Sequence, residues 1–420
     1  MDEKRATNLE EVWLFFDPYT PLEANSKYYI ERLGNALQKL QRWLLRDQPA
    51  PKYFYSGHRG AGKSTELNRL VVDDKIRDKY IVIHYRISDC ADPMNLSHVD
   101  IIFSLGTQIF FQYTDSDTGY GKKLPKTLLA ELEGWRGRIE DRVKTVDKKV
   151  GASAEANLNA FFLKALAWSK AEESSRVQIR QILEPRLSEL ISTINLMVSA
   201  IAAQEKKQVL VIIDDLDKPP LDKAKEVFYG YHTILMQPVC GVIYTVPSAI
   251  FFAPEYAALR EQSFFLPNVK LHRPGKPNEK LDTGYATMRE FFSRRASRRL
   301  IDDAALETAA TASGGVFREY ARLIRTAADL AIEANREQIS LIDVNRAEAE
   351  LRNEFTHFLT PADYQTLREI EQNPHFKDPE RLSPLLHNLA ALEYHNDQSW
   401  YGVHPALLPL IRELNGNRND

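Results

Sequence analysis

Three glycines and a lysine stand in the segment of this sequence best suited to chemistry, Gly57-His58-Arg59-Gly60-Ala61-Gly62-Lys63-Ser64. The segment fits the pattern G-x-x-x-x-G-K-[ST], in which backbone N–H groups and a helix N-terminus hold a chain of phosphates. Lys63 is expected to reach the β- and γ-phosphates, and the Ser64 hydroxyl is expected to ligate Mg²⁺. With Thr65 completing the contacts of the loop, the sequence predicts a site for ATP or ADP with Mg²⁺.

A run of apolar residues that ends in acids supplies the second half of the predicted site. Val209 to Ile213 is unbroken by polar residues, as expected of a strand buried on both faces, and Asp214 and Asp215 follow it. Ligands of parallel α/β sheets bind at the carboxyl ends of the strands. Asp214 is therefore expected to hold Mg²⁺ and Asp215 to orient or deprotonate the attacking water, while Asp217 is left open between a site role and an acidic turn.

The elements that must position these residues alternate between strands and helices, which predicts an α/β fold with a doubly wound, parallel, five-stranded sheet. Strands are predicted at 52–56, 80–87, 208–213, 241–246 and 268–272, and helices at 25–45, 64–72 and 98–113. Residues 272–277 read as a linker because of their Pro and Gly content. The chain beyond is predicted to be helical over 282–359, then two helices, a short ribbon near 394–403 and a closing helix.

Residues 114–207 interrupt this alternation with amphipathic helices. One apolar face contains Leu128, Leu132, Trp135, Ile139 and Val143; after a break at 151–153, a heptad-like seam contains Leu183, Leu187, Leu190, Ile194, Met197 and Ile201. Pro185 is expected in the first turn of the seam helix or at a kink in it. The pattern leaves two interpretations open, helices packed on the main domain or a projecting hairpin that docks a partner.

These motifs and their order resemble AAA+ ATPases, and specifically the branch shared by origin-recognition initiators and STAND signalling ATPases. The acids Asp214-Asp215-Leu216-Asp217 carry this resemblance, since most other AAA+ proteins have glutamate at the second position. The shorter Asp215 suits a slow, switch-like ATPase. The resemblance implies a P-loop domain at 25–275, a helical lid at 276–359 and a winged-helix domain at 360–420. It does not account for an N-terminal extension at 1–24 or for the helical insertion at about 114–207 in the P-loop domain.

The same resemblance implies roles for four further residues. Thr245, which ends the fourth strand, matches a polar sensor of the γ-phosphate, and Arg318, in Gly314-Gly315-Val316-Phe317-Arg318-Glu319, matches a second sensor on the lid. Arg260 lies near the place of a finger that enters the site of a neighbouring subunit. His404 matches a histidine that contacts bound ADP in STAND proteins, although Val-His-Pro departs from their Met-His-Asp pattern.

Bulk properties exclude several classes of protein. The 420 residues have a net charge of -3, which argues against a surface devoted to nucleic acid, and two cysteines cannot form a disulfide framework. The apolar runs are too short to span a bilayer and no signal peptide appears, so a cytoplasmic protein is expected. No guanine-binding N-K-x-D pattern appears, which favours adenine without deciding between ATP and GTP.

Two functions fit these features. The first is a STAND-like switch in prokaryotic signalling or anti-phage defence, in which nucleotide controls homo-oligomerisation or activates a separately encoded effector or sensor protein. The alternative is a DNA-handling ATPase of replication initiation or transposition, with Arg294, Arg295, Arg298 and Arg299 meeting phosphates. The few basic residues near the predicted wing make DNA the less favoured partner.

The P-loop assignment predicts that Lys63→Ala abolishes ATP binding, because the substitution removes the ammonium group expected to hold the phosphates. Titration with a fluorescent ATP analogue measures the loss. Tight binding retained by Lys63→Ala would show that the phosphates lie elsewhere.

Overall fold

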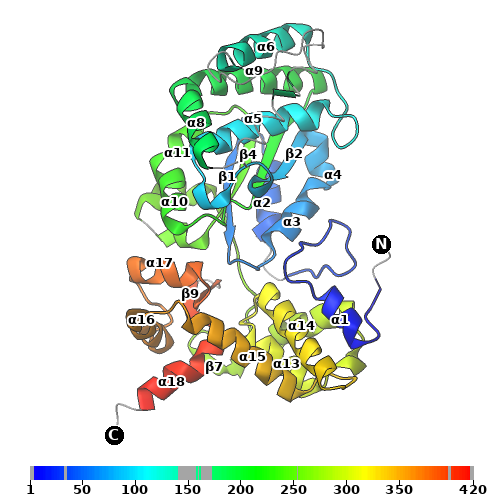
Figure 1. The fold of residues 1–420 in the computed structure, drawn as a ribbon, viewed down its shortest axis with the longest axis vertical. Coiled ribbons are helices and arrows are strands. Elements are labelled where there is room, and N and C mark those ends of the chain that lie inside the picture. The colour runs from blue at the N-terminus through cyan, green and yellow to red at the C-terminus, as the bar shows by residue number, and fades with distance from the viewer. Residues whose placement is uncertain are drawn as a thin grey trace.

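The computed structural model describes residues 4–32, 36–140, 158, 160–161, 173–252, 254–395 and 399–416. Five parallel strands form its main sheet in the order β2-β3-β4-β1-β5 (Figure 1). They are β1 (Lys52–Gly57), β2 (Tyr80–Arg86), β3 (Gln208–Asp214), β4 (Gly241–Val246) and β5 (Ser263–Leu266). The α/β fold with a five-stranded parallel sheet, as predicted from the sequence, is confirmed.

Helices cover both faces of this sheet, and the side chains of β3 show why its sequence is apolar without a break. Val209, Val211 and Ile213 belong to the core on the face of α5 (His98–Thr114). Leu210 and Ile212 belong to the core on the opposite face. That second face is covered by α2 (Ala36–Leu44), α3 (Lys63–Val71) and α4 (Asp74–Lys79). Because successive side chains point to opposite faces, a strand buried on both sides has no polar position.

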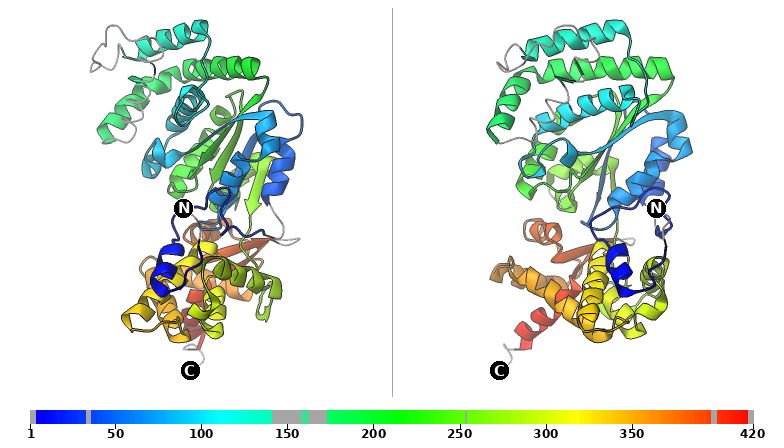
Figure 2. Two further views of the ribbon diagram at one scale, coloured as in Figure 1. Left: turned by 90° about the vertical axis from the view of Figure 1, so that its right-hand side faces the viewer. Right: turned by 45° about the vertical axis from the view of Figure 1, so that its right-hand side comes forward.

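The described part of the 114–207 segment packs on the main domain. It comprises α6 (Lys126–Glu140), α8 (Glu173–Leu183) and α9 (Leu187–Glu205), stacked on α5 above the sheet (Figures 1 and 2). The six seam residues from Leu183 to Ile201 are buried in the same core as α5, and a Cβ added at Gly106 of α5 would lie 2.8 Å from Ile194. This contact favours packed helices over a projecting hairpin. Val143 and residues 151–153 lie outside the described residues.

Pro185 stands in a single 3-10 turn, Glu184–Arg186, between α8 and α9, so the seam is split at the proline. By length and composition alone, the stretch Arg176–Glu205 would suffice to cross a membrane. Core helices of soluble proteins pass the same test, and here Leu190, Ile194 and Met197 pack against the sheet domain.

Three predictions about local structure are wrong. The helix expected from 25 begins only at Ala36; before it, residues 17–32 form an irregular strap along α3. Side chains of α3 form hydrogen bonds with the backbone of the strap in place of helical ones. Thr65 Oγ1 accepts from Leu22 N at 3.1 Å. Asn68 Nδ2 donates to the Leu22 carbonyl at 2.9 Å, and Arg69 Nη1 donates to the Ala24 carbonyl at 3.0 Å.

The fifth strand is Ser263–Leu266 rather than 268–272, because its register with β1 pairs Phe54 with Ser263 and Gly57 with Leu266. The expected linker at 272–277 instead forms an antiparallel ribbon of β6 (His272–Arg273) and β7 (Lys276–Lys280). Gly275, at φ 64°, supplies the left-handed residue of its turn, so the Pro and Gly content marks a hairpin.

A mostly helical region lies below the sheet (Figures 1 and 2). Its helices are α1 (Leu9–Phe15), α12 (Asp282–Arg295), α13 (Asp303–Ala312), α14 (Phe317–Glu333) and α15 (Leu341–Thr356). A C-terminal unit follows, made of α16 (Pro361–Gln372), α17 (Pro379–His387), β8 (Ala391–His395), β9 (Ser399–Val403) and α18 (Leu408–Gly416). One apolar core includes residues from α1, from the helical region and from this unit. The division at 359/360 and the winged-helix assignment therefore stay predictions.

Two short helices, α10 (Leu221–Lys225) and α11 (His232–Leu235), join β3 to β4. The two halves of the predicted site follow β1 and β3, which are separated in the sheet only by β4. Since all three strands are parallel, the carboxyl ends of β1 and β3 lie at one edge of the sheet.

Candidate nucleotide-binding site

The P-loop joins the end of β1 at Gly57 to the start of α3 at Lys63. Gly60 and Gly62 have φ values of 82° and 94°, in the left-handed region that favours glycine. A Cβ at Gly60 would lie 2.3 Å from Cβ of Arg318, and one at Gly62 would lie 2.7 Å from Nη2 of Arg32. Backbone conformation therefore favours glycine at both positions, and at Gly60 the close approach of the Arg318 Cβ requires it as well.

Lys63 is buried, and three acceptors surround its ammonium group. Its Nζ donates to the carbonyls of Gly57 and His58 at 2.8 and 3.0 Å. It also forms an ion pair with Asp217 Oδ2 at 2.8 Å. The lysine thus faces the acids that follow β3, which brings the two predicted halves of the site together.

The three aspartates after β3 form a compact cluster in which one carboxylate oxygen from each lies within 4.8 Å of the others. Burial, and then the neighbouring charge of Asp217, raises the pKa of Asp214 to about 6, while the Ser64 hydroxyl acts in the opposite direction. Burial also acts to raise the pKa of Asp217, but the ion pair with Lys63 outweighs it and the pKa is lowered. Buried carboxylates next to a hydroxyl are ligands that fit Mg²⁺.

Asp215 has a strained and engaged position. Its φ is 67°, which is uncommon for a residue with a side chain. Its Oδ2 accepts a hydrogen bond from Ser88 Oγ at 2.7 Å and pairs with Lys218 Nζ at 2.7 Å. The carboxylate is held beside the adjoining pocket, which Asp215, Asp217 and Lys218 line.

Thr245 lies at the end of β4 as predicted, but its hydroxyl is fully buried and engaged with β3. Thr245 Oγ1 donates to the Ile213 carbonyl at 3.2 Å and accepts from Leu216 N at 2.9 Å. In this arrangement it holds the loop that carries the aspartates. Its contact with a γ-phosphate stays a prediction.

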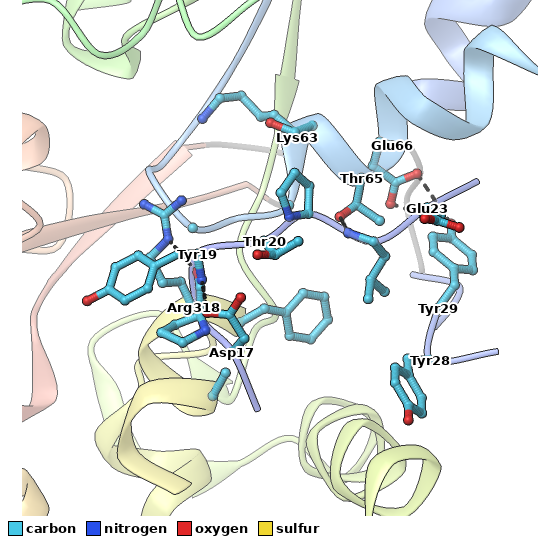
Figure 3. A pocket seen from close by; sticks show the side chains of 18 of the residues that line it. Asp17, Tyr19, Thr20, Glu23, Tyr28, Tyr29, Lys63, Thr65, Glu66 and Arg318 are labelled. Carbon is cyan, nitrogen blue, oxygen red and sulfur yellow. Dashed lines mark hydrogen bonds between the residues drawn. The ribbon is translucent and has the colours of Figure 1, made fainter. Parts of the chain in front are cut away.

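A pocket of about 730 Å³ lies between the P-loop, the strap and the helical region. The P-loop and the start of α3 line it through Arg59, Gly60 and residues 62–66, and Asp215 and Asp217 line it as well. Residues 17–23, 28–30 and 32 of the strap line it too, as do α12 and α14 through Phe291, Arg295, Phe317 and Arg318. Figure 3 shows Arg318 on the strap side of this pocket and the Lys63 side chain extending away from the strap.

Arg318 reaches the P-loop through its backbone as well as its side chain. Its N–H donates to the Gly60 carbonyl at 3.2 Å, and its Nε donates to the Pro18 carbonyl at 3.1 Å. The predicted sensor arginine is therefore placed at the pocket, although the structure does not test its role toward a phosphate.

Sequence reasoning missed the strap as part of the site. Arg32 donates to the carbonyls of Ala61 and Pro267 and lies over the Phe317 ring, 4.4 Å from its centre. Tyr29 lies beside it and donates to Glu66 of α3 at 3.3 Å (Figure 3). The only signal in the sequence was an aromatic and basic run, Tyr28-Tyr29-Ile30-Glu31-Arg32, without helical periodicity.

Two P-loop residues expected to contact nucleotide also contact the C-terminal unit. His58 Nε2 accepts a hydrogen bond from the Glu393 N–H of β8 at 2.7 Å. Burial, followed by the charge of Lys63, lowers the pKa of His58 to about 3, so the ring is neutral and able to accept. Arg59 Nη2 donates to the Lys218 carbonyl at 2.9 Å and lies 3.2 Å from His387 Nε2 of α17.

The structure does not bring His404 or Arg260 to the pocket. His404 is fully buried against Phe355, with 4.8 Å between ring centres, and its Nδ1 accepts from Ala406 N at the turn before α18. Arg260 is exposed in the 3-10 segment Pro254–Gln262. The predicted contact of His404 with ADP has no counterpart in this arrangement, and the action of Arg260 on a neighbouring subunit stays a prediction.

No family model and no curated protein matches this chain. Among solved structures, it is similar to Cdc6p from Pyrobaculum aerophilum, with 12% identity, a TM-score of 0.41, and 95% of this chain and 98% of that chain covered. It is also similar to the ORC2 protein of Aeropyrum pernix in ADPNP–ADP complexes, with 12% identity, a TM-score of 0.43, and 96% and 98% covered.

A third similar structure is the RuvB Holliday junction branch migration motor of Thermotoga maritima, with 11% identity, a TM-score of 0.35, and 92% and 98% covered. Likenesses this distant carry no argument about activity. The fold rests on the parallel sheet and the P-loop geometry of the chain itself.

The raised pKa of Asp214 predicts a pH-dependent stability. A carboxyl group whose pKa rises from 3.8 to about 6 on folding favours the folded state while it is protonated, and that contribution is lost as the pH rises through 6. Without Mg²⁺, Asp214→Asn should therefore be more stable than the wild type at pH 7.5, by up to about 3 kcal/mol. The gain should shrink toward pH 4. Urea unfolding measures both.

Asp222→Asn, which removes an exposed carboxylate from α10, is the charge-matched control. If both substitutions change the free energy of unfolding equally at the two pH values, the raised pKa does not belong to Asp214.

Proposed function

We propose that this protein binds ATP with Mg²⁺ and hydrolyses it slowly. The observation that carries the proposal is that Lys63 and the aspartate cluster lie together beside one pocket. The loop after β1 supplies the ammonium group, and the end of β3 supplies the carboxylates. Lys63 Nζ and Asp217 Oδ2 are 2.8 Å apart. Phosphates need cationic and N–H donors, and their metal needs oxygen ligands. Both sets of groups stand side by side here.

The residues take distinct parts in this proposal. The P-loop N–H groups and Lys63 bind the phosphates, and Ser64 and Asp214 hold Mg²⁺, which withdraws charge from the phosphate oxygens. Asp215 orients the attacking water and accepts its proton. Thr245 keeps the aspartate loop in register with β4 through its two hydrogen bonds. Arg318 lies where it neutralises charge on the far side of the pocket.

Slow turnover follows from the state of Asp215. Its Oδ2 already accepts hydrogen bonds from Ser88 and Lys218, so this oxygen is occupied before water arrives. Water that is to be activated at this oxygen has to displace one of these partners first. Such a site suits a protein that is switched by its nucleotide rather than driven by rapid hydrolysis.

The contacts of His58 and Arg59 support a switch that involves the C-terminal unit. A residue of the P-loop bonds β8, and the next residue lies against α17. Nucleotide that changes the P-loop must bind differently to the docked and undocked states to shift their populations. ADP would keep the unit docked, and ATP would release it for homo-oligomerisation or for a separately encoded effector or sensor. This is the signalling or anti-phage function we favour, in the cytoplasm.

The DNA-handling function remains the alternative. The basic cluster of α12 and the following turn gives it little support, because Arg294 pairs with Glu290 at 2.6 Å, Arg298 pairs with Asp303, and Arg295 is buried. Cations that are already paired contribute less to phosphate binding. A salt titration of duplex binding separates the alternatives, since a strong fall in affinity with salt belongs to the DNA-handling function only.

Hydrolysis itself is tested with Asp215→Asn, which keeps the size of the side chain and removes the proton acceptor. Phosphate release should fall by about 10²-fold or more while ATP affinity changes little. Equal background release by wild type and variant would mean that the chain binds nucleotide without hydrolysing it.

The switch is tested by hydrogen exchange at β8. The Glu393 N–H is protected by His58 in this arrangement. A slowly hydrolysed ATP analogue should speed its exchange relative to ADP, because the C-terminal unit leaves the P-loop. The fully buried core of β3, including Leu210 and Ile212, serves as the internal control. Identical protection of β8 with both nucleotides would show that nucleotide does not control the docking of the C-terminal unit.

A further inference from the structure

Asp217 accepts the hydrogen bond from Lys63 that a phosphate oxygen would need to accept. The ammonium group has three N–H donors. Two of them bond the carbonyls of Gly57 and His58, which belong to the P-loop itself, and the third bonds Asp217 Oδ2 at 2.8 Å. A phosphate can therefore reach Lys63 without rearranging the loop only by replacing Asp217.

We propose that Asp217 is a positioning residue that holds Lys63 in the nucleotide-free protein and releases it only when nucleotide and Mg²⁺ arrive together. This inference rests on the proposed ATP site and concerns how that site is opened. It assigns Asp217 a role distinct from those of Asp214, which holds the metal, and Asp215, which faces the water.

The requirement for both ligands follows from burial. Asp217 is 7% exposed, and a buried carboxylate left without a cation is strongly unfavourable. Arg59 donates to the backbone carbonyl of Asp217 at 3.3 Å, and its positive charge offsets part of the charge of the Asp217 carboxylate. When a phosphate takes Lys63, Asp217 needs a second cation. Mg²⁺ at the cluster supplies it, because an oxygen of Asp217 lies within 4.8 Å of oxygens of Asp214 and Asp215.

Nucleotide that arrives without Mg²⁺ brings no cation for Asp217. Its phosphates approach three carboxylates, and the P-loop lysine that they need is already paired with Asp217. Binding of free nucleotide should therefore be weak for two reasons, general repulsion by the cluster and the specific competition of Asp217 for Lys63. Asp215 separates these two reasons. Its carboxylate also repels phosphates, but it does not compete for Lys63, because its partners are Ser88 and Lys218.

The experiment compares Asp217→Asn with Asp215→Asn, each of which removes one charge from the same cluster. ADP is the probe, because its binding does not depend on hydrolysis, and affinity is measured by calorimetry in excess EDTA and in excess Mg²⁺. In EDTA, Asp217→Asn should bind ADP at least about tenfold more tightly than the wild type, the effect of freeing one charged hydrogen-bond donor. Asp215→Asn should gain less than about threefold.

The ratio of affinities with and without Mg²⁺ should accordingly fall in Asp217→Asn and remain large in Asp215→Asn. Equal gains in EDTA for the two variants would overturn the proposal, since repulsion alone would then explain them. No gain in Asp217→Asn would overturn it as well.

A second measurement needs no nucleotide and so separates this inference from the proposed function. In a thermal double-mutant cycle, Lys63→Met should lower Tm by several degrees because it leaves Asp217 buried and unpaired. Adding Asp217→Asn should restore part of that loss, while the cost of the two unbonded P-loop carbonyls cancels in the cycle. Additive effects would show that no such pair exists. If the cycle shows coupling but the wild type binds no nucleotide at all, the ATP site fails and the lysine–aspartate pair stands.

Discussion

A single buried ammonium group organises this molecule. Lys63 ends the P-loop at the carboxyl edge of β1, and its charge is balanced by an acid from the carboxyl edge of β3, two positions away in the sheet. Neither group would be stable there alone, because an unpaired charge in a buried site costs several kcal/mol. The parallel sheet brings both ends to one edge, and the unbroken apolar sequence of β3 carries its aspartates to that place.

Three segments far apart in the chain converge on the loop that Lys63 ends. The strap contacts it through Arg32, the helical region through the bond of Arg318 to Gly60, and the C-terminal unit through the bond of Glu393 to His58. Each contact uses a backbone or side-chain group of the P-loop. A ligand that moves this loop therefore acts on all three segments at once, which is the physical basis for a switch.

Much of this arrangement could be predicted from local sequence. Four of the five strands (β1 to β4), the P-loop and the aspartates have signals within a few residues, an apolar run or fixed spacing. Residues 25–32 of the strap were predicted as part of a helix because their aromatic and apolar side chains were read without their partners, which lie on α3. The contact of His58 joins residues 335 positions apart, and no local pattern announces it. His404 was assigned by its motif, whereas packing against Phe355 decided its position.

The most direct test of the central claim is an experimental structure with a non-hydrolysable ATP analogue and Mg²⁺. The account predicts the triphosphate against the N–H groups from Gly60 to Thr65, with Lys63 turned from Asp217 to a phosphate oxygen and the metal between Ser64 and Asp214. A nucleotide bound elsewhere, or bound here with the Lys63–Asp217 pair intact, would contradict it.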